Sequence, residues 1–257
     1  MESHYPILEY DPSPLAIIEP GSDEEAPRLP APVVLCFFQE IIQELVSEGS
    51  LTQISEINSE MGANPLYQID FAGQAILVFQ PGVGAPLSAG FLEEVIAMGG
   101  KYFIVCGGCG VLDKKFDAGH PFIIESAIRD EGTSYHYLPP AREVNASPQA
   151  VSALEETCRA HRLEYSLTKS WTTDAIYRET DQRRAMRINE GCQIVEMEAS
   201  ALFAVAQFRQ VTLGQIVYAG DVVIPEGWDG RKWNARKETR RFLFQLALEA
   251  VGRLASG

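Results

Sequence analysis

The chain has 257 residues, 46% of them hydrophobic, and a formal net charge of −14 at pH 7. This length suits one large α/β domain, and no break in composition indicates a second. The charge argues against a general nucleic-acid binder, which needs a basic face to meet phosphates. No apolar run reaches the roughly 18 residues of a membrane span, and the N-terminus lacks the features of a secretory signal. Five scattered cysteines suit a reducing cytoplasm.

Short apolar strands alternate with helices along the first half of the chain. A strand-like run at residues 15–18 lies in a segment rich in proline and acidic residues. The pattern then predicts strands at residues 33–38, 75–79, 101–106 and 121–126, with helices at 39–47 and 88–98.

The second half continues the alternation. It predicts an amphipathic helix over residues 147–162 with Ser147 as its N-cap. A helical run at 202–208, a strand at 213–223 and a long helix at 235–254 follow. Such alternation is typical of a largely buried sheet in an α/β layer fold.

Two carboxylates flank a methionine at Glu196-Met197-Glu198, directly before the helical run. The helix dipole and the free N–H groups at a helix start favour carboxylates there and keep them ionised. An ionised glutamate can accept hydrogen bonds from the 2′- and 3′-hydroxyls of a ribose at once. The methionine offers a soft apolar floor for the sugar. The alternative interpretation is an ordinary acidic first turn of a helix.

Glu196-Met197-Glu198-Ala199 resembles the ribose-binding signature of the nucleoside phosphorylase superfamily. That family includes uridine phosphorylase, hexameric purine nucleoside phosphorylase and methylthioadenosine nucleosidase. Residues 106–110 resemble its glycine turn, 128–137 a segment of the uridine phosphorylase branch, and 173–177 its base-pocket stretch. The resemblance runs from about residue 15 to the C-terminus. It implies a three-layer α/β/α sandwich with a mixed, twisted central sheet, formed as a single domain over residues 1–257 with an irregular segment at 1–32 that carries one strand.

The resemblance also implies which residues bind the substrate. Ile176 stands where the family has a phenylalanine that stacks on the base, which weakens stacking. Thr180 and Gln182 fall in the register of the Gln-x-Arg that reads uracil, although Gln182-Arg183-Arg184 could supply that pair after a two-residue insertion. The choice between purine and pyrimidine therefore stays open. The substrate-binding residues implied are Glu196, Met197, Glu198, Gly107, Gly108, Asp174, Ile176 and Tyr177.

Asp221 resembles the acid that protonates or hydrogen-bonds the departing base, and Arg231 resembles the arginine that pairs with it. Breaking a glycosidic bond develops negative charge on the base, which an acid within hydrogen-bond reach neutralises. Positive charge develops on the sugar, where the carboxylate of Glu198 stabilises it electrostatically. The catalytic residues implied are therefore Asp221, Glu198 and Arg231. The alternative for Asp221 is a cap at the end of a strand.

The phosphate site departs most from the family. Its phosphorylases carry a Gly-Asp-Pro-x-Arg loop near the N-terminus, whereas residues 19–25 are acidic and lack an arginine. Val105 and Gly108 replace the expected arginine and the Ser or Thr of the glycine turn. Carboxylates repel phosphate, and Arg28 or Arg129 could substitute only after a rearrangement. Phosphate is the co-substrate by family, but an atypical or missing site favours water.

The sequence therefore predicts cleavage of the N-glycosidic bond of a nucleoside. The alternative is a non-catalytic nucleoside-binding sensor or scaffold on the same fold. No cofactor is expected, and no metal, because the lone Cys106/Cys109 pair cannot fill a tetrahedral zinc site.

The resemblance implies a homo-oligomer, either a dimer or a trimer of dimers. Residues 7–8 and 135–137 are candidate interface material, since exposed aromatic and apolar side chains favour association. His4 stands where the family has a histidine that reaches the sugar's 5′-hydroxyl in a neighbouring subunit, although a terminal histidine is more often disordered.

Overall fold

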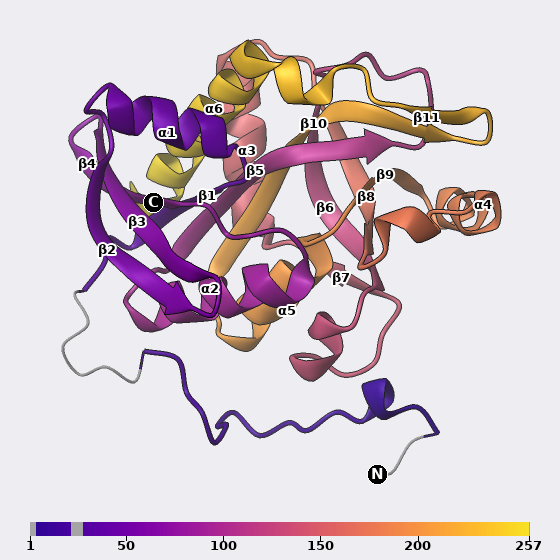
Figure 1. The fold of residues 1–257 in the computed structure, drawn as a ribbon, viewed down its shortest axis with the longest axis horizontal. Helices are drawn as coiled ribbons and strands as arrows, with labels where there is room; N and C mark the ends of the chain where they lie inside the picture. The colour runs from indigo at the N-terminus through magenta and orange to yellow at the C-terminus, as the bar shows by residue number, and fades with distance from the viewer. Residues whose placement is uncertain (1–3, 22–27, 257) are drawn as a thin grey trace.

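The computed structural model describes residues 4–21 and 28–256 (Figure 1). The strands in these residues belong to a single mixed sheet. They are β1 (Pro32–Cys36), β2 (Thr52–Ser59), β3 (Gly62–Phe71), β4 (Gln74–Phe79), β5 (Tyr102–Val111), β6 (Pro121–Asp130), β7 (Glu143–Asn145), β8 (Ser166–Thr173), β9 (Cys192–Glu196), β10 (Thr212–Ile224) and β11 (Gly227–Asp229).

Helices cover both faces of the sheet. The α-helices are α1 (Gln39–Ser47), α2 (Ala85–Ala97), α3 (Pro148–Ala160), α4 (Asp181–Asn189), α5 (Ala199–Phe208) and α6 (Lys237–Ser256). The short 3-10 helices are η1 (Pro6–Leu8), η2 (Thr133–His136), η3 (Ile176–Arg178) and η4 (Trp233–Ala235). One core lies between the sheet and α1, α3 and α6, and the other between the sheet and α2 and α5. The expected three-layer α/β/α architecture is confirmed (Figure 1).

The strand order is β11-β10-β6-β8-β9-β5-β1-β4-β3-β2, with β7 on β6 and a further pairing of β10 with β5. That extra pairing closes β5, β9, β8, β6 and β10 into a ring. Strand β10 can serve both neighbours because it is 13 residues long and its register on β5 shifts between Ala219 and Asp221. A bulge of this kind bends a strand and increases its twist.

Most of the predicted helices and strands are present, with shifted ends. The strand predicted at residues 15–18 is wrong: these residues form neither helix nor strand, and Ile17 and Ile18 are exposed. The β2–β3 hairpin was not predicted: β2 is largely polar and exposed, although Tyr67, Ile69 and Phe71 of β3 alternate with polar residues and could have indicated a strand. Ser147 is at the N-cap of α3, but its Oγ accepts a hydrogen bond from the backbone N–H of Leu213 rather than from its own helix.

The predicted glycine turn is also wrong, because β5 continues as a strand through residues 107–110. The glycines let neighbouring side chains approach this strand closely. A Cβ at Gly107 would lie 3.2 Å from the Phe37 ring, and one at Gly110 would lie 3.0 Å from Cγ1 of Val195. Over residues 4–21 and 28–256, no helix has the length and apolarity needed to cross a membrane.

Candidate functional site

Three strands bring the predicted site segments together. Gly110 of β5 pairs with Asp221 of β10 on one side and with Val195 of β9 on the other. Strand β9 ends at Glu196, and Glu198 immediately precedes α5. The glycine segment of β5 and the end of β9, which leads into Glu196-Met197-Glu198, are therefore neighbours in the sheet, with the acid Asp221 alongside.

Glu196 holds the motif in place from within. Its carboxylate is buried, and burial raises its pKa. Oε1 accepts hydrogen bonds from the hydroxyls of Ser170, at 2.9 Å, and Thr172, at 2.5 Å. Oε2 accepts the backbone N–H groups of Glu198, at 2.8 Å, and Ala199, at 2.6 Å, which are free donors at the start of α5. Because both oxygens have partners within the chain, Glu196 shapes the loop that presents its neighbours.

Glu198 is the buried carboxylate that this loop presents. Its Oε1 accepts the backbone N–H of Gly84, at 2.6 Å, directly before α2. Burial, with the nearby charge of Glu196, raises the pKa of Glu198 to about 8. The expectation that the helix start keeps this group ionised is therefore wrong below that pH, because burial outweighs the helix dipole. Met197, between the two glutamates, is half-buried. The side chain expected to bind ribose is thus fixed between the starts of α2 and α5.

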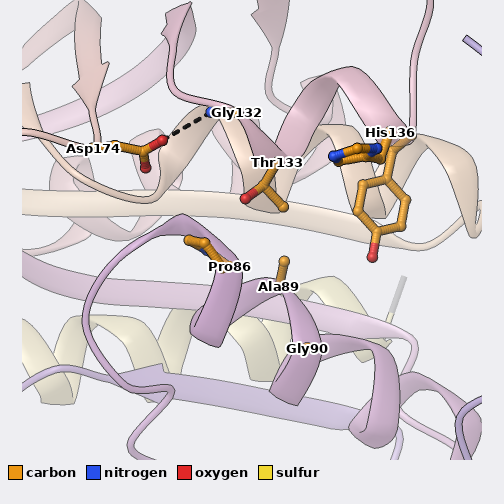
Figure 2. A pocket seen from close by; sticks show the side chains of 8 residues that line it. Pro86, Ala89, Gly90, Gly132, Thr133, His136 and Asp174 are labelled. Carbon is orange, nitrogen blue, oxygen red and sulfur yellow. Dashed lines mark hydrogen bonds between the residues drawn. The ribbon is translucent and has the colours of Figure 1, made fainter. Parts of the chain in front are cut away.

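A cavity of about 470 Å³ lies between α2 and η2 (Figure 2). Asp174 contributes to its lining, accepts the backbone N–H of Gly132 at 2.9 Å, and its charge helps to raise the pKa of Glu198. Ile176 and Tyr177, predicted beside Asp174 in the base pocket, do not line this cavity and are 53% and 95% exposed. The lining residues are Pro86, Ala89, Gly90, Gly132, Thr133, His136, Tyr137 and Asp174.

A buried polar network connects the η2 wall of the cavity to α5. Glu131 accepts hydrogen bonds from the backbone N–H of Ser134, at 2.9 Å, and from the Ser134 hydroxyl. The hydroxyl of Ser200, in α5, also donates to Glu131, at 2.9 Å. The backbone N–H of Ser200 donates to Thr172 Oγ1, at 3.1 Å, and thereby joins the contacts of Glu196. No local sequence pattern indicates this network, because Glu131, Thr172 and Ser200 lie far apart in the chain.

Asp221 is held by a different residue from the one predicted. Its Oδ2 accepts the indole N–H of Trp228, at 2.6 Å. Arg231 donates its guanidinium N–H to the backbone oxygen of Phe116, at 2.6 Å, and acts on Asp221 through its charge, which lowers the pKa of that acid. Burial is the largest influence on Asp221 and raises its pKa. Burial, together with the charge of Asp221, raises the pKa of Glu179 to about 7.

The two arginines that could replace the missing phosphate ligands are not free to do so: Arg129 already donates to other groups of the chain, and Arg28 lies at the opposite end of α2 from Glu198. Arg129 is buried and donates to the Ser134 hydroxyl, at 2.8 Å, and to the backbone oxygens of Pro139 and Leu138. Arg28 lies beside Gly99, past the C-terminal end of α2, whereas Glu198 meets the start of that helix.

The sheet begins with β1 at Pro32, so residues 19–25, which were matched to the phosphate loop, precede its first strand. The segment that follows that strand is Phe37-Phe38. Residues 22–25 lie outside the described part of the chain. Val105 is fully buried in the core, and the ring of Phe37 packs against Gly107.

Two further expectations concern peripheral groups. His4 is exposed and its ring contacts Tyr5, so its role at a neighbouring subunit stays a prediction. Among residues 4–21 and 28–256, no group of three or more His, Cys, Asp or Glu side chains could hold a metal ion.

Comparison with known families decides the relationship. The sequence model of the phosphorylase superfamily matches residues 33–254. The chain belongs to this superfamily. The match starts after residues 19–25, which agrees with the position of β1 as the first strand of the sheet.

Curated relatives and solved structures of the phosphorylase superfamily are distant. Guanosine phosphorylase from Halorubrum lacusprofundi is 26% identical over 65% of this chain and 70% of the relative. Uridine phosphorylase from Haemophilus influenzae is 25% identical over 54% of this chain, which spans about half (52%) of that relative. The structure of purine nucleoside phosphorylase from Toxoplasma gondii in complex with immucillin-H matches with a TM-score of 0.77 and 20% identity. It covers 88% of this chain and 92% of its own, so the fold is shared.

Proposed function

We propose that this protein cleaves the N-glycosidic bond of a ribonucleoside. The observation that carries the proposal is that Gly110 pairs with Asp221 of β10 and with Val195 of β9, the strand that ends two residues before Glu198. Both groups have pKa values raised by burial: the ionised form of Glu198 suits the ribose hydroxyls, and the protonated form of Asp221 suits the departing base. Relatives named as phosphorylases favour an enzyme over a non-catalytic binder.

The chemistry follows from charge. The bond between C1′ and the base nitrogen breaks with its electron pair moving to the base, and the proton of Asp221 neutralises that charge. The sugar becomes cationic at C1′, near the carboxylate of Glu198, and an oxygen of the nucleophile then bonds to C1′. With water as nucleophile, that water loses a proton to solvent, Asp221 regains a proton from solvent, and the products are free base and ribose. With phosphate, the products are free base and ribose 1-phosphate.

Water is the nucleophile that we propose. Support comes from Arg129, which is committed to Ser134 and two backbone oxygens, and from Arg28, at the far end of α2. The segment after β1 carries phenylalanines rather than a cation, and Phe37 fills the space over Gly107. A phosphate dianion in such a site would lack opposing charge.

The test is release of free base from inosine, adenosine and uridine, with and without phosphate, in buffers cleared of phosphate. Equal rates in both conditions support hydrolysis. Cleavage that requires phosphate would contradict the choice of water while leaving bond cleavage intact. No release from any ribonucleoside in either condition would contradict the proposed activity itself.

We propose that no cofactor takes part and that the protein acts as a homo-oligomer. We also propose a cytoplasmic location. The five cysteines are free and buried, which supports this because extracellular proteins more often carry disulfides.

A further inference from the structure

Trp228 is the side chain that fixes the candidate acid. It lies in β11, opposite Val223 of β10, and is 66% exposed. Its indole N–H donates to Oδ2 of Asp221 over 2.6 Å. Gly230 makes room for the ring, because a Cβ there would lie 2.8 Å from Cη2 of the indole. The indole is therefore folded back along its own hairpin and onto the acid.

The second oxygen of Asp221 faces the glycine strand. Oδ1 lies 3.5 Å from the position that a Cβ of Gly110 would take. One oxygen is thus tied to the indole, and the other is directed toward the strand where the site segments meet. A carboxyl group held at one oxygen loses its freedom to rotate, and this fixes the direction in which the other oxygen can act.

Arg231 supports this arrangement from behind. Its guanidinium donates to the backbone oxygen of Phe116, in the connection between β5 and β6. Arg231 and Lys232 have positive φ angles of 42° and 53°, so the chain turns sharply after the hairpin. The arginine therefore anchors the segment that carries Trp228.

We infer that Trp228 is a positioning residue, which orients Asp221 toward the departing base in place of the arginine expected there. This inference rests on the proposed function. A residue that only packs beside Asp221 would affect all substrates alike. A residue that orients Asp221 affects only substrates whose base needs a proton to leave.

Trp228→Phe removes the donor and keeps an aromatic ring, so it tests the inference directly. We expect kcat for a ribonucleoside to fall about tenfold, a part of the 10²–10⁴ that general acid catalysis supplies, with KM little changed. 4-Nitrophenyl β-D-ribofuranoside, whose leaving group needs no proton, should be cleaved as fast by the variant as by the native protein. The hydrogen bond from Trp228 lowers the pKa of Asp221, so its loss should also move the alkaline limb of the nucleoside pH profile to higher pH.

The matched control is Trp233→Phe, which keeps the backbone oxygen that accepts from Tyr218 and a ring beside Arg240. It should leave the ratio of the two rates unchanged. An equal loss on both substrates in Trp228→Phe, or no loss on either, would overturn the inference while leaving the proposed function standing.

A second measurement does not depend on turnover. In an NMR titration of the native protein, the indole N–H signal that Trp228→Phe removes should shift as Asp221 ionises. In Asp221→Asn that shift should be absent. An indole signal that titrates identically in both proteins would overturn the inference even if no nucleoside were cleaved.

Discussion

Glu198 and Gly84, 114 positions apart in the chain, meet through a hydrogen bond of 2.6 Å from the backbone N–H of Gly84 to Oε1 of Glu198. The contact joins the starts of α2 and α5, the two helices that cover one face of the sheet. A carboxylate between two helix starts lies in the favourable field of both dipoles. This contact therefore fixes the position of the residue expected to bind the ribose.

Gly84→Ala should disturb this contact. Gly84 has φ 93° and ψ 147°, a region that is almost restricted to glycine and costs a residue with a side chain about 1–3 kcal/mol. We expect lower stability together with weaker nucleoside binding, measured by thermal unfolding and titration. Gly90→Ala, inside α2 with open space around its Cβ, is the control and should not lower stability. Normal stability and affinity in Gly84→Ala would contradict the role of this backbone donor.

Stability should depend on pH through Glu198. The folded protein keeps a proton on this group up to a pKa of about 8, whereas the ordinary value is 4.5. The contribution of this proton to the free energy of unfolding is complete below the pKa of the unfolded state, and it is lost as pH rises through the pKa of the folded state. The free energy of unfolding should therefore fall between pH 4.5 and about 8. Glu198→Gln should flatten this fall in urea unfolding, and an equal fall in both proteins would contradict the raised pKa.

Asp221→Asn should separate binding from chemistry. The amide keeps the size of the side chain but cannot supply a proton to the departing base, so turnover should fall by roughly 10²–10⁴. Nucleoside affinity, measured by calorimetry, should stay close to the native value. Loss of affinity with unchanged turnover per bound substrate would assign Asp221 to binding instead.

We predict at least a homodimer. Ile7 and Leu8 are 40% and 41% exposed, and His136 is exposed beside two half-buried tyrosines in η2 and its C-cap. Apolar and aromatic surface of this kind is typical of interfaces. Light scattering at micromolar concentration should give at least twice the mass of 28.3 kDa, and a monomeric mass would count against the prediction.

The sequence was most informative where chemistry is local. Apolar patterning predicted β1, β4, β5, β6 and β10 with every α-helix except α4, and the Glu-Met-Glu segment carried its own signal before α5. It did not predict β2, β3, β7, β8, β9 or β11. Gly84 could have been found, because Gly82-Val83-Gly84 separates a strand from a helix and both glycines have positive φ. This backbone donor was missed because its partner lies far away in the chain.

Other parts of the site depend on tertiary contacts that no local pattern encodes. The pairing of β10 with both β5 and β6 turns residues 107–110 into a strand rather than a turn. The hydrogen bond from Trp228 to Asp221 depends on the β10–β11 hairpin. Arg231, which the resemblance pairs with Asp221, donates to a backbone oxygen instead. Residues 19–25 follow the apolar run at 15–18, which forms no strand, and they precede β1, where the sheet begins.

The most direct test of the account compares release of free base from ribonucleosides by the native protein and by Glu198→Gln. The amide keeps an oxygen for Gly84 but cannot ionise, so at a pH above the pKa of about 8 it lacks the charge that holds the ribose hydroxyls and faces the developing cation. Hydrogen bonds to charged groups contribute about 1.5–3 kcal/mol, so release should fall at least tenfold while the circular dichroism spectrum is unchanged. Full ribonucleoside affinity and turnover in Glu198→Gln would contradict the assignment of this site.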